Sequence, residues 1–412
     1  MFSIWSTIGL ELPFTLLLLA LLGFRRSVTP HASLVINAPR DKVFALVDVF
    51  DGKTENWGQT TIRADLVNPE TQSYRKTYTT TMASGSPRSS SALFRIAERA
   101  EGSRLVLSRE GLEGKSHNNE LLRQDYSLID EGDKTRLSMT YHWGPRPLIA
   151  QLLARADLWG GIYRLRSMAE DGRVSDRAYQ LISSAVAIGT GIISIAAFAI
   201  VLGLPAAVLL VFALFVHELG HLIAYRLMGQ PWGRMMFLPF LGAIAIPRFA
   251  FETQGQAVFA ALMGPAFSTI LAVACTLATY GPGPSSPFIA VLGLVAVGLN
   301  LFNLLPVEPL DGGVALRSVL QRLMGRHARF GLMIIGALII NIGFSMEQVI
   351  LIIFGGLAIL ANLKDRTIDA GLKPLSTLQM SIAAFAYVAM AAAYITLLRH
   401  FLAYASLLQN QG

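Results

Sequence analysis

The 412-residue sequence is poor in cysteine and in charge. Its only cysteine, Cys275, lies inside an apolar run, which excludes an intrachain disulfide and a metal site built from several thiolates. Charged residues make up 15% of the chain and hydrophobic residues 53%, and the mean hydropathy is +0.50. Soluble domains are about one quarter charged, so this composition predicts a multi-pass membrane protein.

The charge is unevenly distributed, because most of it lies between residues 25 and 177. The remainder is a series of long apolar runs with short polar breaks, so we expect one soluble domain and one membrane domain. The isoelectric point of about 9.6 does not require a nucleic-acid partner. Arginine and lysine at the ends of apolar runs set orientation in a membrane, and the sequence has no recognised nucleic-acid-binding motif. We therefore expect no nucleic-acid partner.

The first apolar run, from Ile8 to Phe24, is about the minimum length for a span and is followed by Arg25 and Arg26. A cleaved signal peptide carries its positive charge before the apolar core and a small-residue cleavage site after it, and this run has neither. We expect residues 1–28 to form a retained transmembrane anchor whose C-terminal end faces the cytoplasm.

Residues 29–178 have the pattern of a soluble α+β domain. Alternating polar and apolar residues predict strands, and turn residues such as those of DEGD separate them. The candidate strands are HASLVINAP, YRKTYTTTM, ALFRIAERA, SRLVLSRE, RQDYSLIDEG and TRLSMTYHW. From Leu148 the apolar residues recur at helical spacing, which predicts a long amphipathic helix at the end of the domain. A curved antiparallel sheet wrapped around this helix is the expected assembly.

This order of elements resembles the START-like superfamily of polyketide cyclases and lipid-transfer domains, which has a helix-grip fold. The resemblance rests on the INAP strand end, on a helix that carries Val43, Phe44 and Val47, and on the segment around Trp57. In that superfamily the sheet and the helix enclose an apolar cavity, so the resemblance implies a domain that binds an apolar ligand or a partner. An ordinary packed core without a ligand is the alternative that the sequence leaves open.

Seven further spans are predicted after Tyr179 from the lengths of the apolar runs. They cover residues 180–203, 205–228, 255–279, 287–307, 329–345, 347–363 and 377–398. Basic residues such as Arg173, Arg317 and Lys364 flank the runs on one side, whereas the loop 281–287 is uncharged. The positive-inside rule therefore places the START-like domain and the basic loops in the cytoplasm, and we expect the membrane to be the bacterial inner membrane. We divide the membrane part into a core at residues 179–370 and a C-terminal helix and tail at residues 371–412.

The second of these spans contains an H-E-x-x-H pattern formed by His217, Glu218 and His221. This spacing places two imidazoles on one helix face, where they can share one Zn²⁺ ion, and Glu218 projects about 100° further round and can reach a water molecule. Ionisable groups are costly inside a bilayer, which favours a functional role. The alternative is a polar contact between helices, with Glu218 paired to an arginine such as Arg226.

A hydrolytic zinc site needs a third protein ligand and an open position for water. The other acidic residues and histidines after residue 180 are Glu252, Glu308, Asp311, Glu347, Asp365, Asp369, His327 and His400. Most of them lie in loops among basic residues, whereas Asp311 directly follows an apolar run that Pro306 and Pro309 interrupt. Irregular backbone at membrane depth is tolerated where it lines a water-filled cavity, so Asp311 is the expected third ligand.

HELGH in one span and NLLPVEPLDGG two spans later resemble the site-2 protease family of intramembrane zinc metalloproteases. The family pattern N-x-x-P-x-x-x-L-D-G falls on Asn303, Pro306, Leu310, Asp311 and Gly312. The resemblance covers about residues 180–370 and implies one Zn²⁺ ion held by His217, His221 and Asp311. It also implies that Glu218 is the catalytic base and that Asn303 orients the substrate or stabilises the oxyanion.

Two other segments resemble this family less specifically. The stretch ALMGPAF at 261–267 contains Gly264 and Pro265, which are similar to a small-residue segment of the family, and close helix packing is the alternative. Residues 235–251 are too short and too rich in proline for a span. In the family a hairpin at this place lies beside the active site and can pair with an extended substrate, and a re-entrant loop is the alternative.

These observations predict a multi-pass α-helical membrane domain with a site-2 protease-like core, joined to a soluble α+β START-like domain. The predicted function is hydrolysis of peptide bonds in transmembrane protein substrates, within or near the cytoplasmic side of the bilayer, with gating by the START-like domain. The expected partners are the substrate, the lipid bilayer and an apolar ligand of the START-like domain. The alternative is a membrane-anchored lipid-binding or lipid-sensing protein with a non-proteolytic zinc core, against which the intact Glu218 argues.

Overall fold

The computed structural model describes residues 25–50, 52–57, 60–81, 87–110, 121–175, 177–280, 287–363 and 372–411. The predicted anchor run, Ile8 to Phe24, lies outside the described residues, as does most of the loop 281–287. The chain divides into two compact units, one that ends at Ala185 and one that begins at Val186. The division falls within helix α4 (Arg177–Leu202). The two units are described separately below.

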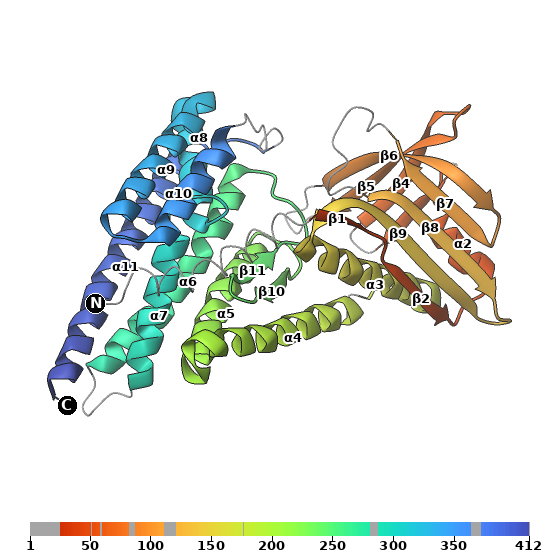
Figure 1. The fold of residues 1–412 in the computed structure, drawn as a ribbon. Coiled ribbons are helices and arrows are strands. Elements are labelled where there is room, and N and C mark those ends of the chain that lie inside the picture. Colours follow the sequence, from red (N-terminus) through yellow and green to blue (C-terminus); the bar gives the residue numbers. More distant parts are fainter. Residues whose placement is uncertain are drawn as a thin grey trace. The chain divides into compact units, whose positions relative to one another are not determined.

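The first unit contains a nine-stranded antiparallel sheet in the order β1-β9-β8-β7-β6-β5-β4-β3, with β2 also paired to β9 (Figure 1). The six predicted strands are present as β2 (His31–Ile36), β5 (Ser73–Thr81), β6 (Pro87–Ala100), β7 (Arg104–Arg109), β8 (Leu121–Asp130) and β9 (Thr135–Pro147). The sequence analysis missed three others, β1 (Arg25–Val28), β3 (Thr54–Trp57) and β4 (Thr60–Asn68). Consecutive strands from β3 to β9 are neighbours, so the sheet is a meander extended by the N-terminal strands.

The long predicted helix is α3 (Leu148–Asp171), which packs against the sheet with the short helix α2 (Arg40–Val47). It begins after Pro147 and ends at Gly172, whose φ of +67° suits a helix C-terminus. Leu158 and Ile162 of α3 are fully buried in one core with sheet residues such as Leu137. Sheet and helix thus form an α+β unit in which an antiparallel sheet packs against a long C-terminal helix, as predicted.

The second unit consists mainly of apolar helices: α5 (Leu204–Leu227), α6 (Gln254–Thr279), α7 (Pro287–Asn303), α8 (Asp311–Met324), α9 (Ala328–Ser345), α10 (Val349–Leu363) and α11 (Thr377–Gln411). Among the described residues, five helical segments are long and apolar enough to cross a membrane. They are residues 179–202, 204–227, 254–279, 311–345 and 377–407, while α7 and α10 are shorter. Each of the seven predicted spans overlaps a helix, and five of the helical segments are long enough to cross a membrane, which confirms a multi-pass membrane domain; the number of seven spans stays a prediction.

Helix α8 is the element of this unit that the sequence analysis missed, because its residues are amphipathic rather than uniformly apolar. It continues through a short 3-10 turn, Gly325–His327, into α9. The stretch around 235–251 forms a hairpin of β10 (Arg234–Leu238) and β11 (Gly242–Ile246), as the family resemblance implied. Tyr225 of α5 donates a hydrogen bond to the Ala245 carbonyl of β11 at 3.2 Å, which holds the hairpin beside α5.

Candidate metal centre

The H-E-x-x-H residues lie in the C-terminal half of α5 and are all buried. His217, Glu218 and His221 have exposed fractions of 2%, 4% and 8%. Three buried ionisable groups in a helix otherwise built of apolar residues require polar partners, since an unpaired buried polar group is costly. The partners of the three side chains therefore indicate what the site can hold.

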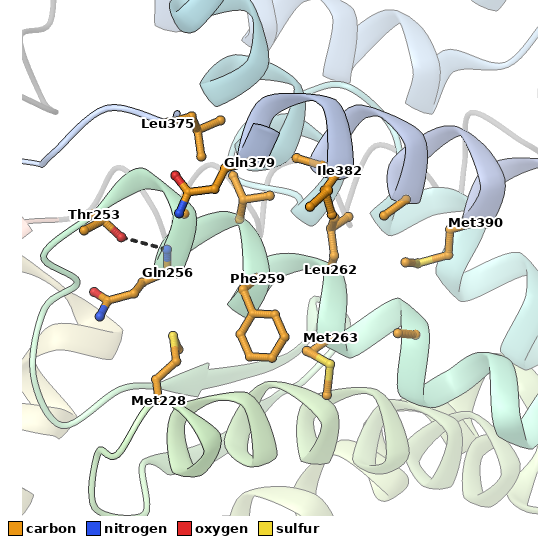
Figure 2. A pocket seen from close by; sticks show the side chains of 15 residues that line it. Met228, Thr253, Gln256, Phe259, Leu262, Met263, Leu375, Gln379, Ile382 and Met390 are labelled. Carbon is orange, nitrogen blue, oxygen red and sulfur yellow. Dashed lines mark hydrogen bonds between the residues drawn. The ribbon is translucent and has the colours of Figure 1, made fainter. Parts of the chain in front are cut away.

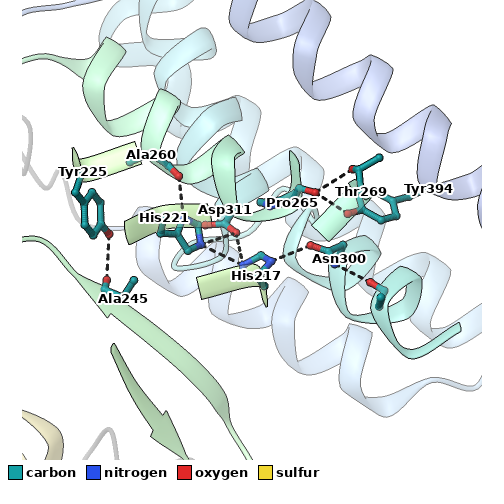
Figure 3. Close-up of polar contacts among 11 residues, drawn as sticks. His217, His221, Tyr225, Ala245, Ala260, Pro265, Thr269, Asn300, Asp311 and Tyr394 are labelled. Atoms are coloured by element: carbon teal, nitrogen blue, oxygen red, sulfur yellow. Dashed lines mark hydrogen bonds and ion pairs between the residues drawn. The ribbon is translucent and has the colours of Figure 1, made fainter. Parts of the chain in front are cut away.

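Each imidazole has one nitrogen engaged by a hydrogen-bond acceptor (Figure 3). The Nδ1 atom of His217 lies 2.8 Å from Oδ1 of Asn300, and that of His221 lies 2.7 Å from the Ala260 carbonyl. Asn300 is fully buried in α7 and donates its own amide to the Ala296 carbonyl at 2.7 Å, so its oxygen faces His217. Both Nδ1 atoms must therefore carry the proton and donate. In the neutral rings the two Nε2 atoms are then lone-pair acceptors.

Asp311 is brought to these nitrogens by the turn between α7 and α8. It is the first residue of α8, and the backbone at Gly312 and Gly313 passes very close to the chain that leaves α7. A Cβ at Gly312 would collide with the Leu304 carbonyl, and one at Gly313 with the backbone of Val307. The two glycines after Asp311 therefore allow the chain to turn back on itself, which side chains at these two positions would prevent.

Three acceptor atoms converge at this point. Oδ2 of Asp311 lies 3.1 Å from Nε2 of His217 and 3.5 Å from Nε2 of His221, and the two nitrogens are 3.1 Å apart. Oδ2 is buried and accepts no hydrogen bond from a described residue. Three lone pairs that face one another at these distances repel unless a cation lies between them.

The spacing fits a zinc ion. Ligands at about 2.0–2.2 Å from a tetrahedral Zn²⁺ are about 3.3–3.6 Å from one another, and the three observed separations lie at or slightly below that range. Two imidazoles and one carboxylate are a donor set found in catalytic zinc sites, and hydrogen bonds that fix the outer nitrogens of zinc-binding histidines are typical. The residues present therefore fit the metal.

Gly264 of α6 makes room for this arrangement. A Cβ added there would collide with the His221 ring and would come within 2.9 Å of Cε1 of His217. The adjacent Gly220 is equally restricted, because a Cβ at that position would meet the Met263 carbonyl. Gly264 is the glycine of the segment that resembles the family, and it also allows the helices to pack closely at the histidines. The two interpretations of this segment are therefore compatible.

Glu218 faces the β hairpin rather than an arginine. A backbone hydrogen bond joins its carboxylate to Ala245 of β11. Arg226, the partner considered in the structural alternative, instead donates to the Gln230 carbonyl at 3.0 Å and lies over the Trp232 ring. The carboxyl of Glu218 also lies close enough to both histidines to share a metal-sized site with them. A carboxylate at this position is available to handle protons beside a bound ion.

The asparagine that contacts the site is Asn300, which the sequence analysis did not single out. Asn303, the asparagine of the family pattern, is the last residue of α7 and is partly exposed. The sequence feature that could have identified Asn300 is an amide side chain within an apolar helix, three residues before Asn303. Its contact with His217 required the packing of α7 against α5.

The interior of the α+β unit holds a second polar group of interest. Lys76 of β5 has only 6% of its surface exposed, and its ammonium lies 5.8 Å from the Phe50 ring centroid and 5.7 Å from that of Tyr78. No hydrogen bond or ion pair joins it to a described residue. On the same face, Tyr126 and Tyr141 are hydrogen-bonded to each other at 3.1 Å, and burial raises the pKa of Tyr141 to about 12. These hydroxyls stay neutral at physiological pH.

The fold and this centre define a membrane domain with a candidate metal site that resembles those of metallopeptidases. Residues 205–285 and 279–342, which include all the residues of the centre, match the model of Peptidase family M50. Zinc is the metal that this family implies.

Curated relatives agree with this assignment. The chain is 33% identical over 130 residues to "Putative zinc metalloprotease sll0528" of Synechocystis sp., which covers 31% of this chain and 34% of that protein. It is 37% identical over 141 residues to "Putative zinc metalloprotease Rip3" of Mycobacterium tuberculosis, with 32% and 35% covered. The matches thus span about a third of these relatives. A solved site-2 protease from Methanocaldococcus jannaschii is 20% identical, with a TM-score of 0.31, and the match covers 45% of this chain and 88% of that one.

Proposed function

We propose that this chain is an intramembrane zinc endopeptidase that cuts transmembrane protein substrates within or near the cytoplasmic side of the bilayer. The observation that carries the proposal is the convergence of two bare imidazole nitrogens and a carboxylate oxygen at 3.1–3.5 Å, beside a fourth buried ionisable group. A structural polar contact would pair donors with acceptors. Here three acceptors meet, which supports a bound cation.

In this proposal His217, His221 and Asp311 hold one Zn²⁺ ion. When bound, zinc supplies a Lewis acid that activates water and polarises a peptide carbonyl. Glu218 accepts the proton of the attacking water and returns it to the leaving amine, so it acts first as a base and then as an acid. The backbone bond from Ala245 fixes the Glu218 carboxylate during both transfers.

The hairpin provides a means of holding the substrate. In the two-stranded sheet, β11 pairs with β10 alone among the described strands, so no strand covers its other edge. An extended substrate that adds to this edge would pass next to Ala245 and thus next to Glu218. Pairing also requires the substrate helix to unwind, which exposes the peptide carbonyl for attack.

The membrane orientation that we propose rests on the distribution of basic residues at the ends of the apolar runs. Helix α8, the 3-10 turn Gly325–His327 and the start of α9 carry a basic cluster that is expected on the cytoplasmic side: Arg317, Arg322, Arg326 and Arg329. The α+β domain, at residues 29–178, then lies in the cytoplasm of a bacterial cell. The anchor predicted at 1–28 has its last four residues, Arg25–Val28, in strand β1 of the sheet, so its C-terminal bound is corrected to residue 24. The core at 179–370 and the C-terminal helix and tail at 371–412 complete the proposed organisation.

We also propose that the α+β domain binds an amphipathic ligand that gates cleavage. Lys76 supports this, because only 6% of its surface is exposed, its ammonium has no acceptor among the described residues, and a ligand carboxylate would supply one. Palmitate and hexadecanol, added to the full-length protein and compared by native mass spectrometry, test the charge requirement. Palmitate should bind more tightly than hexadecanol, and the difference should vanish in Lys76→Met. Equal binding of both ligands by the wild type would contradict the role of Lys76.

The catalytic proposal is tested with purified protein and a model transmembrane substrate. Glu218→Gln should lower the cleavage rate by roughly 10²- to 10⁴-fold, the usual contribution of an acid–base group, while zinc content stays unchanged. Glu347→Gln, a substitution of the same kind at an exposed position, is the matched control and should cleave normally. Removal of zinc by a chelator should stop cleavage, and added zinc should restore it.

Cleavage that persists in Glu218→Gln would contradict the assigned base. Zinc-loaded wild-type protein that cleaves none of a panel of transmembrane substrates, yet binds palmitate, would favour the lipid-sensing alternative. The two measurements therefore separate the functions that the sequence left open.

A further inference from the structure

A groove with a volume of about 470 Å³ opens between α6 and the N-terminal half of α11 (Figure 2). Phe259 and Met263 line it from α6, and Ile382 and Met390 line it from α11. Met228, which caps α5, lies at one side. Thr253, Gln256 and Gln379 make one end polar.

The groove adjoins the metal centre through β11. Met228 and Met263 pack in one hydrophobic cluster with Ala245, the residue whose backbone bonds to Glu218. Met263 also precedes Gly264, the glycine on which the two imidazoles lie. A polypeptide that runs along β11 past Glu218 would therefore meet the groove within a few residues.

The volume limits what can occupy the groove. A helix with its side chains is about 10–12 Å wide and rises about 5.4 Å per turn, which corresponds to roughly 500 Å³ per turn. The groove thus accommodates about one turn of helix, or a few residues of extended chain. It is a subsite rather than a cradle for a whole transmembrane helix.

The chemistry of the lining suits an apolar segment that is losing its helical structure. Three methionines, Met228, Met263 and Met390, provide a deformable apolar wall that adapts to different side chains. At the polar end, Oε1 of Gln379 accepts from the Ser376 backbone at 2.9 Å, and its Nε2 lies over Gly255 on the groove wall. The amide nitrogen can donate to a peptide carbonyl that an unwound substrate exposes.

We propose that this groove is a substrate subsite, which receives about one turn of the apolar transmembrane segment adjacent to the scissile bond. The inference rests on the proposed protease function and adds a specificity determinant to it. Apolar residues of variable shape should be accepted there, whereas a charged residue at the same position of the substrate should be rejected.

The first test fills the groove from two sides. Ala266→Trp on α6 and Ala386→Trp on α11 each place a large ring in it, and Val388→Trp on the exposed face of α11 is the matched control. Both groove variants should lower kcat/KM for a transmembrane substrate by roughly tenfold or more, mainly through KM. A short peptide that spans only the scissile bond should be cut as well as by wild type. Normal cleavage of the transmembrane substrate by both variants would overturn the proposal.

The second test does not depend on catalysis. A photoreactive phenylalanine analogue at position 259, in the Glu218→Gln background, should crosslink to the transmembrane substrate, whereas the same analogue at Phe385, exposed to lipid, should not. Crosslinking succeeds or fails whether or not the wild type is a protease, so failure of the subsite and failure of the function are distinguishable. Capture of a lipid at position 259 despite excess substrate would show that an acyl chain occupies the groove and would also overturn the proposal.

Discussion

The two units of the chain bury polar groups in opposite ways. In the α+β unit, neutral groups are paired locally: Thr60 with Thr80 at 2.9 Å, and Tyr126 with Tyr141 at 3.1 Å. In the membrane unit, the buried ionisable groups of α5 and α8 converge on one point and place acceptor against acceptor. Donor–acceptor pairs complete a fold by themselves, whereas converging acceptors need a cation. This contrast distinguishes polar groups that complete the packing from polar groups that form a functional site.

Lys76 is the exception in the α+β unit, and it sharpens the comparison. It is the one residue discussed there whose charge is buried without an acceptor among the described residues. Among the described residues, no cation faces the acceptors of the centre and no anion faces Lys76. The part of the chain that the structure describes therefore leaves one electrostatic requirement open in each unit, and the following changes test these two places.

The largest effect is expected from Asp311→Asn, which keeps the shape of the side chain and removes its charge. Zinc affinity should fall by more than about 100-fold, because loss of a residue that only supports a ligand already costs 10- to 100-fold. Metal analysis and chelator competition measure the change, and Glu252→Gln serves as the control on a neighbouring acidic residue. Unchanged zinc content would indicate that the ion is held by the cluster of His217, Glu218 and His221 instead.

A smaller effect on zinc is expected from Asn300→Leu, which leaves Nδ1 of His217 without its acceptor. Zinc affinity should fall roughly 10- to 100-fold. Asn303→Leu, three residues further along α7, is the matched control and should bind zinc normally. If Asn303→Leu lowers the cleavage rate with full zinc occupancy, the substrate or oxyanion role implied for Asn303 gains support. Loss of zinc from Asn303→Leu alone would reverse the two assignments.

The sequence predicted the elements of this protein better than the contacts between them. The H-E-x-x-H spacing within one helix and the position of Asp311 after a proline-broken run are local features, so both were readable from the chain. Asn300 was not, because residues 300 and 303 are neighbours at helical spacing on α7, and only the packing of α7 against α5 shows that Asn300 is the one that contacts His217. Strands β3 and β4 were missed because they lack a strong pattern of their own: β3 pairs with β4, and β4 pairs with β5.

The smallest effect, and one of opposite sign, is expected from Lys76→Met in the α+β unit. Methionine has a similar length and no charge, so removal of the ammonium should stabilise the domain without ligand by about 1–3 kcal/mol. The two cation–π contacts, at 5.8 and 5.7 Å, lie near the limit of that interaction and contribute about 0.5 kcal/mol each, which leaves a net gain of about 0–2 kcal/mol. Hydrogen exchange of the β5 amides in the full-length protein measures this change. Lys42→Met, at an exposed position of α2, should alter exchange little. A less stable Lys76→Met variant would mean that the chain already satisfies the ammonium, and the argument for an anionic ligand would fail.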